Sequence, residues 1–122
     1  MKSKDLERTG MEMRQKLLGE DGQKALEKLQ KHNPTIARWA LENLFGEVYG
    51  NEVLDLRTRS LCTVSVLIAL GNEGPLTNHM RAALRIGITK EELGEVIAQM
   101  VWYAGLPAAI RAINILDRLL GE

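Results

Sequence analysis

The sequence predicts an all-α protein. The runs of β-branched and aromatic residues that mark strands are missing, and good helix formers dominate its 122 residues. Eleven glycines fall mostly between periodic segments, where they are typical of helix ends. We therefore expect about six or seven helices and no sheet, packed as an orthogonal or bundle-like domain. The length is that of a single domain, 1–122.

The N-terminal part predicts two short helices separated by a break. A weak helix covers roughly the first twenty residues, and Gly19-Glu20-Asp21-Gly22 ends it. The apolar contacts of this helix are Leu6, Met13 and Leu17. In the short helix that follows, Leu26 and Leu29 are expected to point inward, with lysines and glutamates on the opposite side.

Asn33-Pro34 is a helix start, because asparagine is a preferred N-cap and proline suits the first helical position. From there to Gly50, apolar residues recur every four positions and predict a buried stripe. The residues of that stripe are Ile36, Ala40, Leu44 and Val48.

Asp55 is the expected N-cap of a helix from Leu56 to Leu70. This helix is amphipathic only in its first turn, which carries Arg57 and Arg59. After Leu61 it is almost apolar all round, so we expect it to be the central, buried helix.

Three further helices are expected. Gly74-Pro75 opens one that stops at Gly87, and the capping box from Thr89 to Glu92 starts the next. The buried stripe of that helix is predicted to be Leu93, Val96, Ile97, Met100, Val101 and Ala104. Gly105 breaks the helix and Pro107 restarts it. The final helix is expected to bury Ile110, Ile113, Leu116 and Leu120.

Charge and cysteine content exclude several classes of protein. Sixteen basic and sixteen acidic side chains cancel, which removes an electrostatic case for nucleic acid or anionic membrane as partner. A single cysteine excludes an internal disulfide, a CxxC pair and a cysteine-based zinc cluster. The longest apolar run, Val64 to Leu70, is far shorter than the ~20 residues of a membrane-spanning helix. The charged segment Met1 to Arg8 lacks a signal core. A cytoplasmic protein is expected.

Several segments carry a family resemblance. They include Leu54-Asp55-Leu56-Arg57-Thr58-Arg59-Ser60-Leu61, Pro75-Leu76-Thr77-Asn78-His79, Gly87-Ile88-Thr89-Lys90-Glu91-Glu92-Leu93 and Tyr103-Ala104-Gly105-Leu106-Pro107-Ala108-Ala109. The chain resembles the carboxymuconolactone decarboxylase family, which also contains the AhpD-like alkylhydroperoxidases, and is most similar to its γ-carboxymuconolactone decarboxylase branch. The core of the resemblance is 46–116. It implies an all-α fold with paired helices around His79.

His79 is the main candidate for catalysis. Its helix places Ala82, Ala83 and Ile86 on the same side, so the imidazole lies at the edge of an apolar stripe. A partly buried histidine with a hydrogen-bonding neighbour is one interpretation, and a general acid or base with a tuned pKa is the other. The resemblance favours the second, because His79-Met80-Arg81-Ala82-Ala83 with Gly87 matches the histidine helix of the family.

The chain departs from the family at several positions. Where AhpD-like relatives have the two cysteines of a CxxC pair, this chain has Asn72 and Pro75, so dithiol peroxide chemistry is not expected. Decarboxylase relatives often have a glutamate four residues before the histidine. Pro75 stands there, although Glu73 could reach the same space. Gln99 stands where they often have a second histidine. Cys62, in the apolar run, is expected to be an inert core thiol.

Anion binding is expected from arginine, whose guanidinium can hold a carboxylate through two parallel hydrogen bonds. Arg59 is the preferred candidate, with Arg57 and Arg81 as alternatives, although a solvated helix face is the more common explanation for any single arginine. Glu47 lies at a helix C-terminus, where the dipole disfavours an acid, so it is a second catalytic candidate, with fortuitous exposure as the equal alternative. Tyr103 and Trp102 are expected to pack as aromatics, with the Tyr103 hydroxyl able to reach a pocket.

The resemblance implies a cofactor-free lyase of aromatic compound catabolism that decarboxylates a small carboxylated lactone. The unsaturated lactone would take up the electrons, arginines would hold the carboxylates and His79 would shuttle the proton. His32 and His79 have no metal-ligand spacing, so no metal is expected. The alternatives are a non-catalytic oligomeric binding protein of the same fold and an AhpD-like peroxide-reducing partner.

Self-association is also expected. The apolar helices over 61–70 and 93–104 offer more apolar surface than a small domain needs to bury internally. Together with the resemblance, this predicts a homo-oligomer in the form of a ring-like trimer or hexamer.

Overall fold

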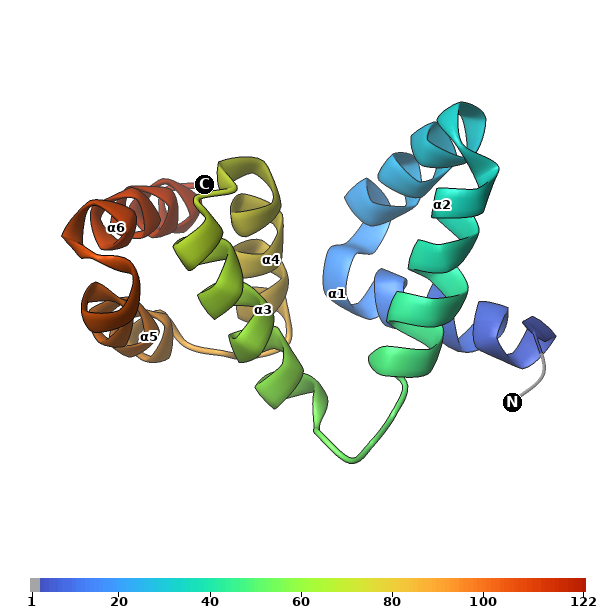
Figure 1. Ribbon diagram of the computed structural model, residues 1–122, viewed down its shortest axis with the longest axis horizontal. Helices are drawn as coiled ribbons and strands as arrows, with labels where there is room; N and C mark the ends of the chain where they lie inside the picture. Colours follow the sequence, from blue (N-terminus) through green and yellow to red (C-terminus); the bar gives the residue numbers. More distant parts are fainter. Residues whose placement is uncertain (1–2) are drawn as a thin grey trace. The chain divides into compact units, whose positions relative to one another are not determined.

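A computed structural model describes residues 3–122 of the protein. These residues form helices and no strand, which confirms the predicted all-α class. The chain forms two compact units, divided between residues 56 and 57. The first holds α1 (Ser3–His32), α2 (Pro34–Arg38) and the π-helix η1 (Trp39–Val48). The second holds α3 (Leu56–Leu70), α4 (Glu73–Arg85), α5 (Lys90–Ala104) and α6 (Leu106–Leu120) (Figure 1). Among the described residues, no helix is long and apolar enough to cross a membrane.

The break predicted after the first twenty residues is a kink inside α1. Gly19 has φ 60° and ψ −149°, which is not helical. Arg14, before the kink, donates a hydrogen bond from Nη2 to the carbonyl oxygen of Gly22, after it, at 2.8 Å. The Arg14 side chain therefore bridges the two halves of α1. Leu17 and Leu26, one on each side, are both buried, as expected.

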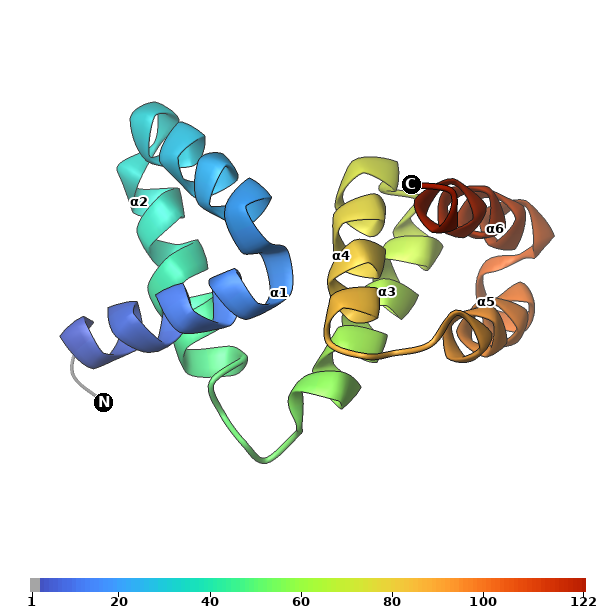
Figure 2. The same cartoon turned by 180° about the vertical axis from the view of Figure 1, so that it is seen from behind.

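In the first unit, α1 crosses η1 at contacts that only glycine allows (Figures 1 and 2). A Cβ atom on Gly10 would lie 2.0 Å from the carbonyl oxygen of Leu41. One on Gly46 would lie 2.4 Å from the carbonyl oxygen of Leu6. Since these neighbours are backbone atoms, they cannot move aside as a flexible side chain would. The two glycines thus set how closely the helices approach.

The start of α2 is as predicted, because the Asn33 Oδ1 accepts a hydrogen bond from the Ile36 amide at 3.1 Å. The predicted buried stripe is wrong by one position. Ile36, Leu44 and Val48 are exposed and Ala40 is half-buried. The buried set is Ala37, Leu41, Phe45 and Tyr49. Both sets recur every four residues, so spacing alone could not separate them. The wide turns of η1, such as the hydrogen bond from the Tyr49 amide to the Leu44 carbonyl at 2.8 Å, keep both sets in line along the helix.

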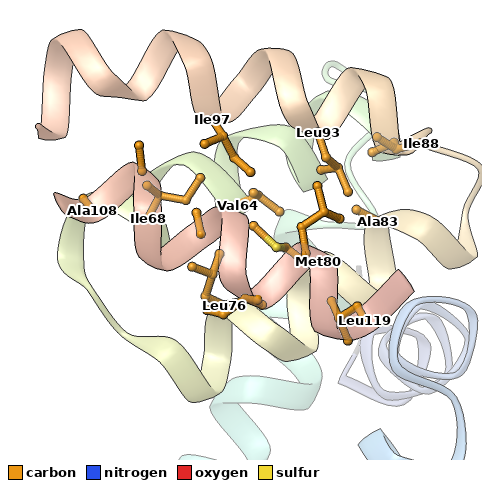
Figure 3. Packing of buried hydrophobic residues seen from close by; sticks show 14 residues of the cluster. Val64, Ile68, Leu76, Met80, Ala83, Ile88, Leu93, Ile97, Ala108 and Leu119 are labelled. Carbon is orange, nitrogen blue, oxygen red and sulfur yellow. The ribbon is translucent and has the colours of Figure 1, made fainter. Parts of the chain in front are cut away.

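The core of the second unit lies between α3, α4, α5 and α6 (Figure 3). Leu93 and Ile97 of α5 point toward Val64 of α3 and Met80 of α4, and all four are buried. The expectation that α3 is buried on all sides is wrong. Val66 and Leu70 are exposed, because the second unit has helices to cover only the face of α3 that carries Val64 and Ile68.

The helix ends of the second unit follow local sequence signals closely. α4 begins at Glu73, slightly before the expected Gly74-Pro75, and ends before Gly87, whose φ is 98°. The Thr89 capping box is confirmed: the Thr89 Oγ1 accepts from the Glu92 amide at 3.1 Å, and the Glu92 Oε1 accepts from the Thr89 amide at 3.0 Å. The other oxygen of the Glu92 carboxylate pairs with Arg57, which links α5 to α3.

The predicted stripe of α6 needs correction. Gly105, at φ 95°, separates α5 from α6 as expected. Of the four predicted core residues only Leu116 is buried, while Ile110, Ile113 and Leu120 are exposed. The buried side of α6 is Ala108, Ala109, Ala112, Ile115, Leu116 and Leu119. Small alanines let α6 approach its neighbours closely. The sequence prediction chose the large apolar residues instead, and most of these lie on another side of the helix.

Candidate active site

His79 lies in the middle of α4, half-buried at the boundary of the core of the second unit. The adjacent Met80, and Ala82 and Ala83 one turn further on, are fully buried. α4 therefore holds the imidazole at the edge of an apolar region built from small side chains. A histidine in such a position can exchange protons with a ligand while its backbone stays fixed by the packed face of the helix.

The three candidate arginines have different surroundings. Arg57 is exposed and paired with Glu92. Arg81 is half-buried, and its Nη2 lies 3.0 Å from Oε1 of Glu122. Arg59 is half-buried near the start of α3, before the apolar part of that helix. A substrate carboxylate would have to displace a protein carboxylate at Arg57 and at Arg81, and the preference for Arg59 stays a prediction.

Glu73 is exposed at the first position of α4. Its carbonyl oxygen accepts a hydrogen bond from the Thr77 hydroxyl at 2.8 Å. Six residues separate Glu73 from His79, which corresponds to a rise of about 9 Å along an α-helix. The helix alone therefore keeps these two side chains nearly two turns apart, and Pro75 between them is also exposed.

An open hollow of about 570 Å³ lies between α3 and α5. Its lining residues are Thr58, Leu61, Cys62, Ser65, Val66, Ala69, Val96, Gln99 and Met100. Gln99, a candidate substrate-binding residue that stands where decarboxylase relatives often have a second histidine, is one of them. The hollow itself was not predicted, although a sequence signal exists: residues 58, 62, 65 and 69 are small and recur with helical spacing on one side of α3.

Two expectations about side chains around this hollow are wrong. Cys62 is exposed and lines the hollow, so it is not a core thiol. Trp102 and Tyr103 do not pack: they are 87% and 79% exposed. In α5 the inward side passes from Ile97 through Val101 to Ala104, which leaves positions 102 and 103 on outer sides of the helix.

Glu47 lies in the first unit, whereas His79, the arginines, Glu73, Gln99 and Tyr103 lie in the second. Glu47 is exposed near the end of η1 and lines a small hollow of about 280 Å³. The other lining residues are Leu6, Gly46, Gly50 and Asn51. Its role as a second catalytic residue stays a prediction.

Comparison with known proteins identifies the family of the chain. A model of the carboxymuconolactone decarboxylase family matches residues 34–118. The chain belongs to this family. The match contains the predicted core of the resemblance, 46–116, and extends it at both ends.

Individual relatives agree with the family model. The chain is 38% identical to 4-carboxymuconolactone decarboxylase of Acinetobacter baylyi over 93% of its own length and 85% of the relative. It is 39% identical to an uncharacterized 15.0 kDa protein of Paracoccus denitrificans, over 81% and 73%. It is 29% identical to nitrosuccinic acid decarboxylase of Metarhizium robertsii, over 71% and 58%. Two of these relatives are named as decarboxylases of different acids, so the family to which the chain belongs is one of decarboxylases.

Proposed function

We propose that the protein is a decarboxylase that acts on a small carboxylated lactone of the 4-carboxymuconolactone type, as part of aromatic compound catabolism. The observation that carries this proposal is the 38% identity to a 4-carboxymuconolactone decarboxylase over 93% of the chain. The named relative of Metarhizium robertsii, which acts on a different acid, supports the reaction type more than the substrate.

The proposed reaction needs one proton and an electron sink. The bond between the carboxylate carbon and the ring breaks, carbon dioxide leaves, and the electron pair is delocalised into the unsaturated lactone. A ring carbon then takes up one proton. Because the lactone accepts the electrons, the protein has only to hold the substrate, exclude water and deliver the proton.

His79 is proposed to deliver that proton. Its half-buried position beside Met80, Ala82 and Ala83 supports this role, because the packed face of α4 fixes the imidazole at the edge of an apolar region where it can still meet a ligand. The imidazolium would give its proton to the ring carbon and recover one from solvent. Arg59 is proposed to bind a remaining carboxylate through paired hydrogen bonds.

The test is His79→Gln, with His32→Gln as matched control, since His32 is the other histidine and lies exposed at the end of α1. Carbon dioxide release from 4-carboxymuconolactone is measured beside thermal melts. We expect His79→Gln to keep the melting temperature and lose about 10²–10⁴ in turnover, and His32→Gln to match the parent. A folded, fully active His79→Gln protein would remove His79 from the mechanism. Absence of release by the parent protein would favour the non-catalytic binding protein instead.

A further inference from the structure

Two polar contacts join α4 to the end of α6 within the second unit. Nη2 of Arg118 donates a hydrogen bond to Oγ1 of Thr77 at 3.2 Å. Four residues further along both segments, Nη2 of Arg81 lies 3.0 Å from Oε1 of Glu122. Each contact joins residues 41 positions apart, so the two segments run past each other in the same direction. We call these two contacts the α4/α6 ladder.

The Thr77 hydroxyl is engaged both as donor and as acceptor. It donates to the carbonyl oxygen of Glu73, one turn earlier in α4, at 2.8 Å, and it accepts from Arg118. A hydroxyl has a single proton, so the bond to Glu73 uses that proton and leaves the oxygen lone pairs for the guanidinium. Arg118 therefore holds α4 through a hydroxyl that is itself fixed to the backbone of α4.

The ladder and His79 lie on opposite sides of α4. An α-helix turns by about 100° per residue, so Thr77 and Arg81 are about 40° apart around the helix and His79 is about 160° or more from each. Within the second unit, α4 has its most extensive backbone contact with α6. The contact with α6 therefore determines how far α4 is rotated about its own axis, and this rotation sets the direction of the imidazole.

Apolar packing near His79 restrains this rotation only weakly. The buried residues in that part of α4 are Met80, Ala82 and Ala83. Methionine is flexible and adapts to a changed position, and alanine is too short to interlock with a facing helix. Hydrogen bonds resist rotation better, because they weaken as their angle departs from linear. The ladder therefore supplies the directional restraint that the small side chains lack.

A small rotation of α4 is enough to affect chemistry at His79. An imidazole lies about 6 Å from the axis of its helix, so a rotation of about 15° moves the ring by about 1.5 Å. A reacting group displaced by about 1 Å can lower a rate about 10²-fold. The contacts of the ladder are exposed, and contacts of this kind add little to stability. Their effect on the position of the imidazole is consequently larger than their effect on folding.

We propose that Thr77 and Arg118 are positioning residues for His79, and that the hydrogen bond between them holds α4 in the rotation at which the imidazole meets the substrate. Arg81 and Glu122 repeat the restraint one turn further on. The inference rests on the proposed function of His79 as proton donor and deepens it by naming the residues that direct the ring. Thr77 and Arg118 act through the imidazole and do not touch the substrate.

Thr77→Val and Thr77→Ser form a matched pair of variants. Valine keeps the branched shape of threonine without the hydroxyl, whereas serine keeps the hydroxyl. With 4-carboxymuconolactone as substrate, we expect Thr77→Val to lower kcat about tenfold to hundredfold and to keep KM within about twofold, because the imidazole moves and the carboxylate site does not. Thr77→Ser should match the parent. Arg118→Met should reproduce Thr77→Val, and the double variant should be no slower than either, because both changes break the same bond.

The ring signals of His79 give a second readout that needs no substrate. The chain has two histidines, and His32 lies in the first unit, so it is an internal reference in a proton–carbon spectrum of the imidazoles. His79→Gln assigns the signals. At one fixed pH, Thr77→Val and Arg118→Met should displace the His79 cross-peak by more than its line width and leave that of His32 in place.

Arg111→Met is the matched control. Arg111 is also an exposed arginine of α6, but its guanidinium lies at the turn after α3, where Nη2 would be 3.2 Å from a Cβ atom on Gly71. This variant should keep the kcat of the parent and the position of the His79 cross-peak. Thermal melts establish that each variant is folded, and Thr77→Val carries the test if Arg118→Met does not fold.

An unmoved His79 cross-peak in folded Thr77→Val would overturn the proposal. A lowered melting temperature with unchanged kcat would overturn it as well, because the ladder would then act on stability alone. A parent protein that releases no carbon dioxide would contradict the proposed function and leave the ring signals to decide the inference. In that case a displaced cross-peak would still support the hold of Thr77 and Arg118 on His79, and an unmoved one would exclude it.

Discussion

The guanidinium of Arg14 lies over the ring of Phe45, with Cζ 4.8 Å from the ring centroid. Phe45 in turn stacks on Tyr49, with 5.1 Å between the ring centroids. Arg14 is only 8% exposed, and this burial lowers the pKa of its guanidinium from the usual value. The side chain thus joins the kinked helix α1 to the buried row of η1 by one hydrogen bond and one ring contact.

Replacing Arg14 should destabilise the first unit. Arg14→Ala removes the ring contact and leaves the Gly22 carbonyl oxygen without its donor. We expect the free energy of unfolding to fall by about 2–4 kcal/mol. Arg8→Ala is the control, because Arg8 forms only an exposed pair with Asp5 and should cost less than about 0.5 kcal/mol. Chemical denaturation measures both. Equal stability of the two variants would contradict a structural role for Arg14.

Two glycine substitutions should have opposite effects. Gly46→Ala places a Cβ 2.4 Å from the Leu6 carbonyl oxygen, so the crossing of α1 and η1 must open, at a cost of about 1–3 kcal/mol. Gly94→Ala, in α5, has nothing within 4 Å of the new Cβ and should stabilise the second unit by up to about 1 kcal/mol. Thermal melts of both variants check the signs. A neutral Gly46→Ala would show that the two helices do not cross so closely.

Arg59 should matter for substrate binding more than Arg57. Arg59→Lys keeps the charge and loses the paired hydrogen bonds, so we expect KM for 4-carboxymuconolactone to rise about tenfold or more. Arg57→Lys should change KM less than about threefold, because Arg57 is exposed and engaged with Glu92. Steady-state kinetics with thermal melts separate binding from folding. The reverse order of effects would move the carboxylate site to Arg57.

Cys62 should have no redox role. Cys62→Ser removes the only thiol of the chain, and because Cys62 is exposed, the free energy of unfolding should change by less than about 0.5 kcal/mol. Carbon dioxide release should equal that of the parent. The measurement is repeated with peroxide as substrate. A peroxide-dependent turnover that disappears in Cys62→Ser would revive the AhpD-like alternative.

Local signals let the helix ends be predicted from sequence, because each depends on residues a few positions apart. The Asn33 cap, the reciprocal hydrogen bonds of Thr89 and Glu92, and the break at Gly105 all appear where the sequence places them. The family could be predicted for the same reason: the residues from Pro75 to His79 and from Tyr103 to Ala109 are continuous segments that can be compared directly with relatives.

Tertiary packing decided which side of each helix is buried. η1 and α6 carry apolar residues on more than one side, so the sequence allowed two faces and packing partners distant in the chain selected one. Leu41 and Phe45 are buried where α1 crosses at Gly10 and Gly46, while Leu44 is left exposed. Alanines of α6 are buried and Ile113 is not, because close approach favours the smaller side chains.

Some features of the candidate site residues could be predicted from local sequence, and others depended on tertiary packing. That His79 belongs to a half-buried helix face followed from its spacing to Ala82 and Ala83, which is a local property. Exposure of Cys62 in a hollow shared with Gln99 could not follow, because it depends on α5 covering one side of α3 and leaving the other open. A helix such as α3, whose sequence is apolar on all sides, is predicted from sequence to be buried on all sides. Only the number of helices packed around it determines how much of that surface stays available for binding.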